Sequence, residues 1–296
     1  MYKNTSDTNI KDEKKTKIRL KKDKFYSILS KSQLYILPFF IVAIFLIIVP
    51  LFFVFISSFT QKDKSSSNAY FIITFEKYIQ LFQSKSVWRV LGISLMYGFF
   101  SSILCIIIGY PIAYILAGIN KKIYTKNLWI IITLPTWICV ILKTIGLQSM
   151  FNLLMPSALG TSFAIIFGMV YLFLPFTIIP ITNSLINQNP IYYKAALDLK
   201  ASKVRAFIDI KLRYSTSGIL TAFNIVFIQA ITTLLIVKYL GANSITMISS
   251  LIETYFLKGG DLGYSAVLSV ALVVIVLLVL FISRVIANTF SRERTK

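Results

Sequence analysis

Long apolar runs alternate with shorter polar segments along the 296-residue chain. Six runs are long enough to cross a bilayer as helices, because about 20 apolar residues span its hydrocarbon core. They cover residues 34–57, 90–117, 128–147, 163–185, 217–238 and 264–287. The pattern predicts an all-α membrane protein with six transmembrane helices. The length of the first run favours a retained helix over a cleaved signal peptide.

Basic residues gather in every second connection between these runs. Ten Lys and Arg lie within 1–33, three in 118–127 and six in 186–213, whereas 148–162 has none, 239–263 has one and the longer segment 58–89 has five. Connections rich in Lys and Arg stay on the cytoplasmic side of a membrane. The charges therefore predict that both termini and the segment 186–213 face the cytoplasm.

The two patterns together divide the chain into five parts. We expect a basic cytoplasmic tail (1–33), a first transmembrane helix (34–57), an external loop or helix (58–89), a core of five transmembrane helices (90–288) and a cytoplasmic C-terminal tail (289–296).

Composition agrees with a membrane protein and excludes several kinds of chemistry. The chain is 56% hydrophobic and 14% charged, with a net charge of +20. Its basic residues lie between apolar runs rather than on one folded patch, so the predicted partner is a lipid bilayer and not nucleic acid. The sequence has no His, no nucleotide-binding P-loop motif and no zinc-type cysteine spacing. We therefore predict no catalytic residue, no metal site and no cofactor in this chain.

The segment from Pro190 to Arg213 has the pattern of two short amphipathic helices with a bend near residues 200–202. The first helix would place on one face Tyr192, Ala195, Ala196 and Leu199, and the second would group Val204, Phe207 and Ile208. Asp209 is spaced to pair with Arg205 or Arg213. Helices this short are unstable alone in water. The membrane surface, the rest of the chain or a partner protein must therefore cover the apolar face.

This segment resembles the EAA loop of ABC-importer permeases, with pattern E-A-A-x3-G-x9-I-x-L-P. The matching residues are Ala195, Ala196, Ile210, Leu212 and the stretch LDLKAS (197–202). The glutamate, glycine and proline of the pattern are replaced by Lys194, Lys200 and Arg213. Matching stretches elsewhere are FEKYIQLF (75–82), GYPIAYILA (109–117), LPTWICVILKT (134–144), GMVYLFLPFTIIP (168–180) and LSVALVVIVLL (268–278). Over about 35–288 the chain is most similar to spermidine/putrescine permease subunits of the PotB type.

The resemblance implies a type I ABC importer permease (MetI-like) fold in a bacterial plasma membrane, with a cytoplasmic coupling helix between spans four and five. Its implied partners are a second permease (PotC type), a dimeric ATPase (PotA type) that holds ATP and Mg²⁺, and an extracytoplasmic substrate-binding protein. The implied ATPase-coupling residues are Lys194, Ala195, Ala196, Asp198, Leu199, Lys200, Ala201, Ser202, Phe207, Ile210 and Leu212. The chain itself would form the pore and would not be an enzyme.

Two of the residues that differ from the pattern, Lys200 and Lys194, lead to physical predictions. A glycine at the bend reaches positive φ without strain, whereas Lys200 would pay about 1–2 kcal/mol for the same conformation. Lys194 reverses the charge of the pattern's glutamate, so the cognate ATPase is expected to present Asp or Glu opposite it.

Polar residues inside the apolar runs are the candidates for lining the pore. Lys143 lies about 22 Å into the third run, and an intramembrane charge is a functional hypothesis that competes with anchoring or helix contact. The other candidates are Gln229, Thr232 and Thr233. Glu253 and Asp261 could meet a cationic ligand or a binding protein outside the membrane, or lie in a solvated loop. The alternative functions are an importer permease for ferric iron, sulfate or an amino acid, and a secondary transporter, which should carry carboxylates within its spans.

Overall fold

The computed structural model describes residues 31–62, 71–119, 122–242, 244–258 and 261–292. All long elements in these ranges are helices, which confirms the predicted all-α class. Strands β1 (Thr60–Lys62) and β2 (Phe71–Ile73) form a short antiparallel pair with Thr60 opposite Ile73. Most of the two predicted terminal tails lies outside the described residues.

The chain divides into two units, residues 1–56 and 57–296. Helix α2 (Lys31–Phe59) crosses this division and provides the first predicted span. Its described side chains from Pro38 to Ile56 are mostly exposed and are apolar on all sides. A helix that is apolar around its whole circumference is suited to the hydrocarbon core of a bilayer.

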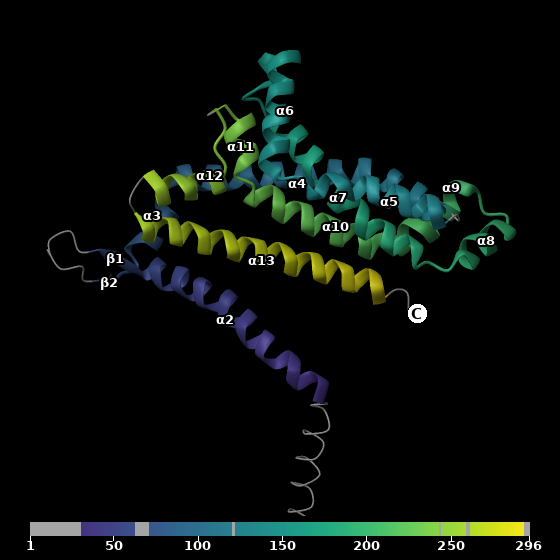
Figure 1. Cartoon of the computed structure of the whole chain (residues 1–296), viewed down its shortest axis with the longest axis horizontal. Coiled ribbons are helices and arrows are strands. Elements are labelled where there is room, and N and C mark those ends of the chain that lie inside the picture. The colour runs from purple at the N-terminus through teal and green to yellow at the C-terminus, as the bar shows by residue number, and fades with distance from the viewer. Residues whose placement is uncertain (1–30, 63–70, 120–121, 243, 259–260, 293–296) are drawn as a thin grey trace, which may run out of the picture. The chain divides into compact units, whose positions relative to one another are not determined.

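Three long helices form the centre of the second unit. They are α4 (Lys85–Gly118), α7 (Ser162–Ile186) and α10 (Arg213–Thr232), and they pack against one another (Figure 1). Helix α4 buries one stripe of small residues, namely Gly98, Ser101, Ser102, Cys105, Gly109 and Ala113. Small side chains let membrane helices approach closely, and helix α13 (Leu262–Arg292) adds a further span against α10.

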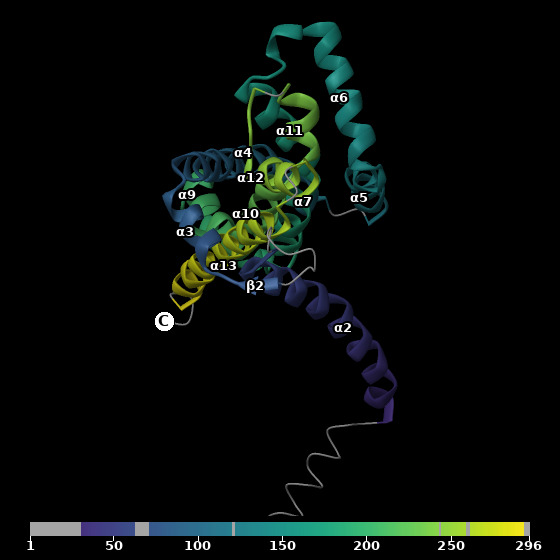
Figure 2. The same ribbon diagram turned by 90° about the vertical axis from the view of Figure 1, so that its left-hand side faces the viewer.

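The third predicted span is not one straight helix. The structure has α5 (Lys122–Trp137) and α6 (Val140–Leu154), which meet at an angle of 88° (Figure 2). Pro135 lacks the backbone N–H that would continue the helical ladder, and Cys139 has non-helical backbone angles, with φ −54° and ψ 132°. The described residues therefore hold five helices able to cross a membrane, or six if the bent pair is one span.

The fifth predicted span is shifted toward the N-terminus. A continuous helical run contains α9 (Lys203–Ala206), the π-helix η2 (Phe207–Leu212) and α10, so it begins at Lys203 and ends at Thr232. Thr233 is extended, and a separate helix α11 (Leu235–Leu240) packs on α6 and α7. The hydroxyl of Ser249 donates to the Thr233 carbonyl at 2.7 Å, which satisfies one group at the break.

Four short elements lie between the long helices. They are α3 (Glu76–Gln83), the 3-10 turn η1 (Pro156–Ala158), α12 (Ile248–Glu253) and the π-helix η3 (Thr254–Lys258). The predicted external segment 58–89 thus contains helix α3 and the first turn of α4, and the segment 239–263 contains α12 and η3.

Both acidic residues of that second segment form ion pairs. The buried ammonium of Lys77 lies 2.7 Å from Asp261 Oδ1 and also donates to the Thr60 carbonyl. Asp261 Oδ1 accepts from the Tyr264 amide and so caps α13. Burial raises the pKa of Asp261, but hydrogen bonds from Lys77 and Tyr264 outweigh it and bring the pKa below its ordinary value. Glu253 pairs with Lys238 at 3.4 Å, so the structure gives each acid a contact within the chain.

Candidate functional site

The predicted coupling segment is folded as two helical pieces separated by a turn. Helix α8 (Pro190–Asp198) starts at proline, and the side chain of Asn189 caps it by accepting from the Ile191 amide at 3.0 Å. Ser202 caps α9 by accepting from the Arg205 amide. The bend therefore lies at residues 199–202, where the sequence predicted it.

The turn has the hydrogen bonds of a Schellman motif. The Lys200 amide donates to the Leu197 carbonyl at 2.9 Å, and the Ala201 amide donates to the Ala196 carbonyl at 3.1 Å. Lys200 has a φ of 61°, the left-handed conformation that this motif requires and that usually selects glycine. Lys200 therefore adopts the backbone geometry of the glycine that it replaces.

Lys200 gives a first testable prediction. Lys200→Gly is expected to reduce hydrogen–deuterium exchange at residues 190–202 slightly. Glycine removes the backbone strain of about 1–2 kcal/mol that lysine has at positive φ. It also costs about 0.5–1 kcal/mol, because glycine has more conformational freedom to lose when the chain folds. Lys200→Val should increase the exchange, because a β-branched residue is poorly tolerated at positive φ. Equal exchange in the glycine and valine variants would contradict the role of this turn.

Helix η2 attaches the segment to the membrane helix α4. The ring centroid of Phe207 lies 5.9 Å from that of Tyr110 and 5.3 Å from that of Tyr114, both in edge-to-face geometry. The Lys211 ammonium lies over the rings of Tyr114 and Tyr193, at 4.9 and 5.2 Å from their centroids. Tyr193 belongs to α8, so Lys211 joins α8 to α4 through two cation–π contacts.

The loop between α7 and α8 is fixed to η2 and to the start of α10. Buried Gln188 donates from Nε2 to the Ile210 carbonyl at 3.4 Å, and the Tyr214 hydroxyl donates to the Asn187 carbonyl at 3.1 Å. Arg205 and Asp209 form the predicted ion pair at 3.5 Å, with both side chains exposed. These contacts hold the two ends of the segment together.

The segment leaves a row of large apolar side chains exposed. The exposed fraction is 83% for Leu199 and 67% for Val204, and further exposed residues are Ile191, Tyr192 and Ile208. We call these five residues the docking face. The described residues of the second unit cover Phe207 with Tyr110 and Tyr114, but they leave this face exposed. The membrane surface or a partner protein is therefore the cover that this part of the structure favours.

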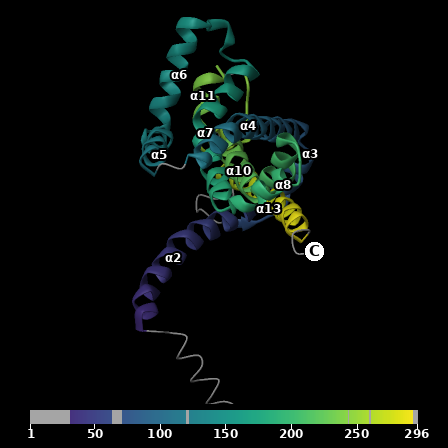
Figure 3. The same cartoon turned by 90° about the vertical axis from the view of Figure 1, so that its right-hand side faces the viewer.

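The other predicted coupling residues all lie in the same continuous segment. Lys194, Ala195, Ala196 and Asp198 are on α8, and Ile210 and Leu212 are on η2. Figures 1 and 3 show that α8 and α9 lie together at the end of the core where α13 also ends. The segment thus sits where α7 and α10 leave the core.

Lys143 has a contact that accounts for its charge within the predicted span. Its ammonium donates to the Pro135 carbonyl at 2.9 Å, across the bend between α5 and α6. The last carbonyls of a helix lack partners inside the helix and carry partial negative charge. Lys143 therefore holds the bend, and this contact favours the helix-contact interpretation over pore lining. It also borders a cavity of about 350 Å³ with Phe167 and Tyr171.

Three of the pore candidates cluster at the end of α10. Gln229 has a buried Oε1 without a hydrogen-bond partner, the Thr232 hydroxyl donates to the Ile228 carbonyl, and Thr233 ends the helix. Lys143 lies on the separate helix α6. The pore role of these residues stays a prediction.

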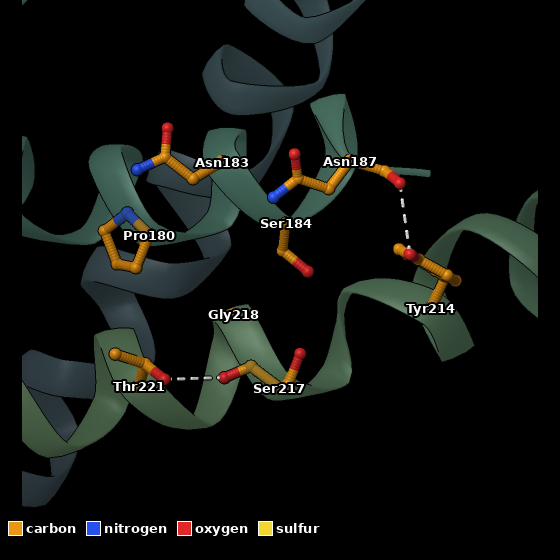
Figure 4. Close-up of a pocket in the computed structure, with 8 residues that line it drawn as sticks. All are labelled: Pro180, Asn183, Ser184, Asn187, Tyr214, Ser217, Gly218 and Thr221. Carbon is orange, nitrogen blue, oxygen red and sulfur yellow. Dashed lines mark hydrogen bonds between the residues drawn. The ribbon is translucent and has the colours of Figure 1, made fainter. Parts of the chain in front are cut away.

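A polar groove between α7 and α10 escaped the sequence analysis. It has a cavity volume of about 390 Å³ and is lined by Pro180, Asn183, Ser184, Asn187, Tyr214, Ser217, Gly218 and Thr221 (Figure 4). The signal was present as helical i, i+1, i+4 spacing of Asn183, Ser184 and Asn187 at the end of an apolar run. The match between this stripe and Ser217 and Thr221 becomes visible only when the two helices are side by side.

Comparison with known families decides the class of the chain. The family described as "Binding-protein-dependent transport system inner membrane component" matches residues 106–295, which is more than half of the chain. The chain belongs to this family. As a family member it is a membrane permease subunit of an ABC importer, and the match includes both the coupling segment and the groove.

Several similar proteins are permeases of one kind. The spermidine/putrescine transport system permease protein PotB of Haemophilus influenzae is 27% identical over 257 residues, covering 81% of this chain and 88% of that protein. PotB of Escherichia coli K12 is 26% identical, covering 76% and 86%. The PotB homolog of Mycoplasma pneumoniae is 24% identical, covering 80% and 83%.

Solved structures agree with the fold of this family. A bacterial ABC transporter involved in the import of the acidic polysaccharide alginate contains a chain that is 19% identical, with a TM-score of 0.65 and coverage of 94% of this chain and 100% of that chain. The alginate transporter in complex with its alginate pentasaccharide-bound periplasmic protein gives a TM-score of 0.66. The predicted importer permease fold is therefore confirmed.

Proposed function

We propose that this permease imports spermidine and putrescine, and that residues 190–212 couple it to a separate ATPase. The docking face carries the coupling proposal, because a folded cytoplasmic element with exposed Leu199, Val204 and Ile191 needs a partner. The substrate proposal rests on the PotB relatives, which cover most of this chain and of themselves.

The proposed complex contains four kinds of subunit. A second permease of the PotC type would complete the pore, and a PotA-type ATPase dimer would bind ATP and Mg²⁺ and receive the docking face. A substrate-binding protein would deliver the polyamine from outside. Both termini of the chain would be cytoplasmic, which is supported by the basic charge of 1–33 and by α13 ending at the same end of the core as α8 (Figure 1).

The contacts of the segment suggest how movement reaches the spans. Phe207 and Lys211 join α8 and η2 to α4, while Gln188 and Tyr214 join the segment to the ends of α7 and α10. A movement of the ATPase would therefore shift α4, α7 and α10 as connected bodies. The exposed side chain of Lys194 on α8 would meet an acidic residue of the ATPase.

Uptake by the reconstituted complex tests this function. Proteoliposomes that contain both permeases, the ATPase and the binding protein should accumulate labelled spermidine and putrescine only when ATP is supplied. Ferric iron, sulfate and amino acids are the comparison substrates. ATP-dependent uptake of one of these instead would overturn the substrate proposal, and full-rate uptake without the ATPase would overturn the coupling proposal.

A further inference from the structure

The groove between α7 and α10 differs from the surfaces that suit lipid. Helix α13 exposes only apolar side chains along its middle, such as Val273, Val274, Leu277, Leu278 and Phe281. The exposed residues of the groove are instead Asn183, Asn187, Ser217 and Thr221. Amide groups that face hydrocarbon lose their hydrogen bonds to water at a cost of several kcal/mol each. This surface is therefore suited to water or to a polar ligand.

We propose that this groove is the inner part of the translocation path and binds the ammonium groups of the transported cation through neutral oxygen atoms. The proposal deepens the proposed polyamine transport and rests on it. Ser184 points from α7 toward α10, where Ser217 lies opposite (Figure 4). Hydroxyl and amide oxygens accept hydrogen bonds from ammonium groups, and the side chains that line the groove include no carboxylate.

A groove lined by neutral oxygen atoms is suited to letting a cation pass through rather than to binding it tightly. An ammonium group in contact with a carboxylate gains a charge-assisted hydrogen bond about twice as strong as a neutral one. Neutral acceptors replace part of the hydration of the cation without holding it as an ion pair. Selection of the substrate is then left to another part of the importer.

The groove is also mechanically joined to the coupling segment. At its floor a Cβ on Gly218 would lie 2.6 Å from Ser184 Cβ and 2.8 Å from the Pro180 carbonyl oxygen, so α7 and α10 touch there without room for a side chain. At its mouth Tyr214 bonds to Asn187, directly beside the two ends of the segment. Movement of the segment would therefore change the width of the groove around the close contact at Gly218.

A charge placed in the groove tests the proposal. Ser217→Lys in the complete importer is expected to reduce uptake of labelled spermidine by about tenfold or more, because a fixed ammonium repels the cation at short range. Its ATPase should still assemble and hydrolyse ATP. The matched control is Thr216→Lys, which places the same side chain one residue earlier and about 100° around the helix. Equal uptake by the two variants would overturn the proposal.

Cysteine labelling decides the outcome if Ser217→Lys fails to assemble. Ser217→Cys and Thr216→Cys are made in a chain in which the exposed Cys139 is replaced by serine. Cys105 can stay, because it is buried. We expect the cationic reagent 2-aminoethyl methanethiosulfonate to modify the first variant faster and to block its uptake. Failure to modify it, or equal modification of both, would overturn the proposal. Wild-type importer that moves no polyamine would instead refute the proposed substrate, while the labelling would still report whether the groove meets water.

Discussion

Leu199→Glu is expected to abolish ATP-dependent uptake while leaving the permease folded. The Leu199 side chain is 83% exposed at the end of α8, so the chain itself loses few contacts. Burial of a leucine under a partner contributes about 1.5–3 kcal/mol, and a glutamate there would add the cost of a buried charge. Docking of the ATPase should weaken at least about thirtyfold. Co-purification of the ATPase with the permease measures this loss.

Leu199→Met provides the matched control, because it keeps the apolar character and nearly the volume of the side chain. The methionine variant should retain ATPase binding and uptake. Thermal unfolding of the isolated permease should be the same for wild type and both variants. A glutamate variant that still binds the ATPase and transports would show that the docking face is covered by lipid and not by a protein partner.

Phe207→Ala is expected to uncouple ATP hydrolysis from transport. The docking face remains intact in this variant, so the ATPase should still bind. The contacts of the Phe207 ring with Tyr110 and Tyr114 are lost, however, and these connect the segment to α4. Truncation of a well-packed phenylalanine costs about 3–5 kcal/mol when the ring is fully buried, and the half-buried Phe207 should lose about half of that. Uptake should fall while ATP hydrolysis continues, and the ratio of the two measures the uncoupling.

Val204→Ala is the control for this second variant. Val204 lies three residues earlier in the same helical run, but its side chain is 67% exposed and belongs to the docking face. Its truncation should weaken ATPase binding modestly and should not change the amount of substrate moved for each ATP. An alanine at position 207 that leaves this ratio unchanged would show that movement reaches α4 by another contact.

The coupling segment was the part of the chain most accessible to prediction. Its pattern is local: the spacing of Tyr192 and Leu199, the proline at 190 and the Arg205–Asp209 pair all act within a few residues. The bend, the helix start and the ion pair were therefore predicted correctly. The cation–π contacts of Lys211 were not predicted, because Tyr114 is almost a hundred residues away in the sequence.

The shapes of two spans could not be read from hydropathy. The run 128–147 is mostly apolar, so its mean hydropathy does not show that Cys139 leaves the helical conformation and that the helix bends by 88°. The bend brings the Pro135 carbonyl within hydrogen-bond distance of the Lys143 ammonium. In the same way, the apolar run 217–238 continues past Thr233, where the helix ends and its carbonyl binds Ser249. Tertiary contacts determine where these two helices break. Hydropathy averaged along the sequence carries no information about tertiary contacts.

The left-handed cap at Lys200 also has a consequence for how related chains are recognised. The turn has the left-handed backbone conformation although lysine stands where the pattern has glycine, so the residue type at this position does not by itself identify the turn. A motif search that demands glycine at this place would discard this chain and any other that accepts the same strain. A structure-based search that scores the backbone hydrogen bonds of this turn would find such divergent transporters.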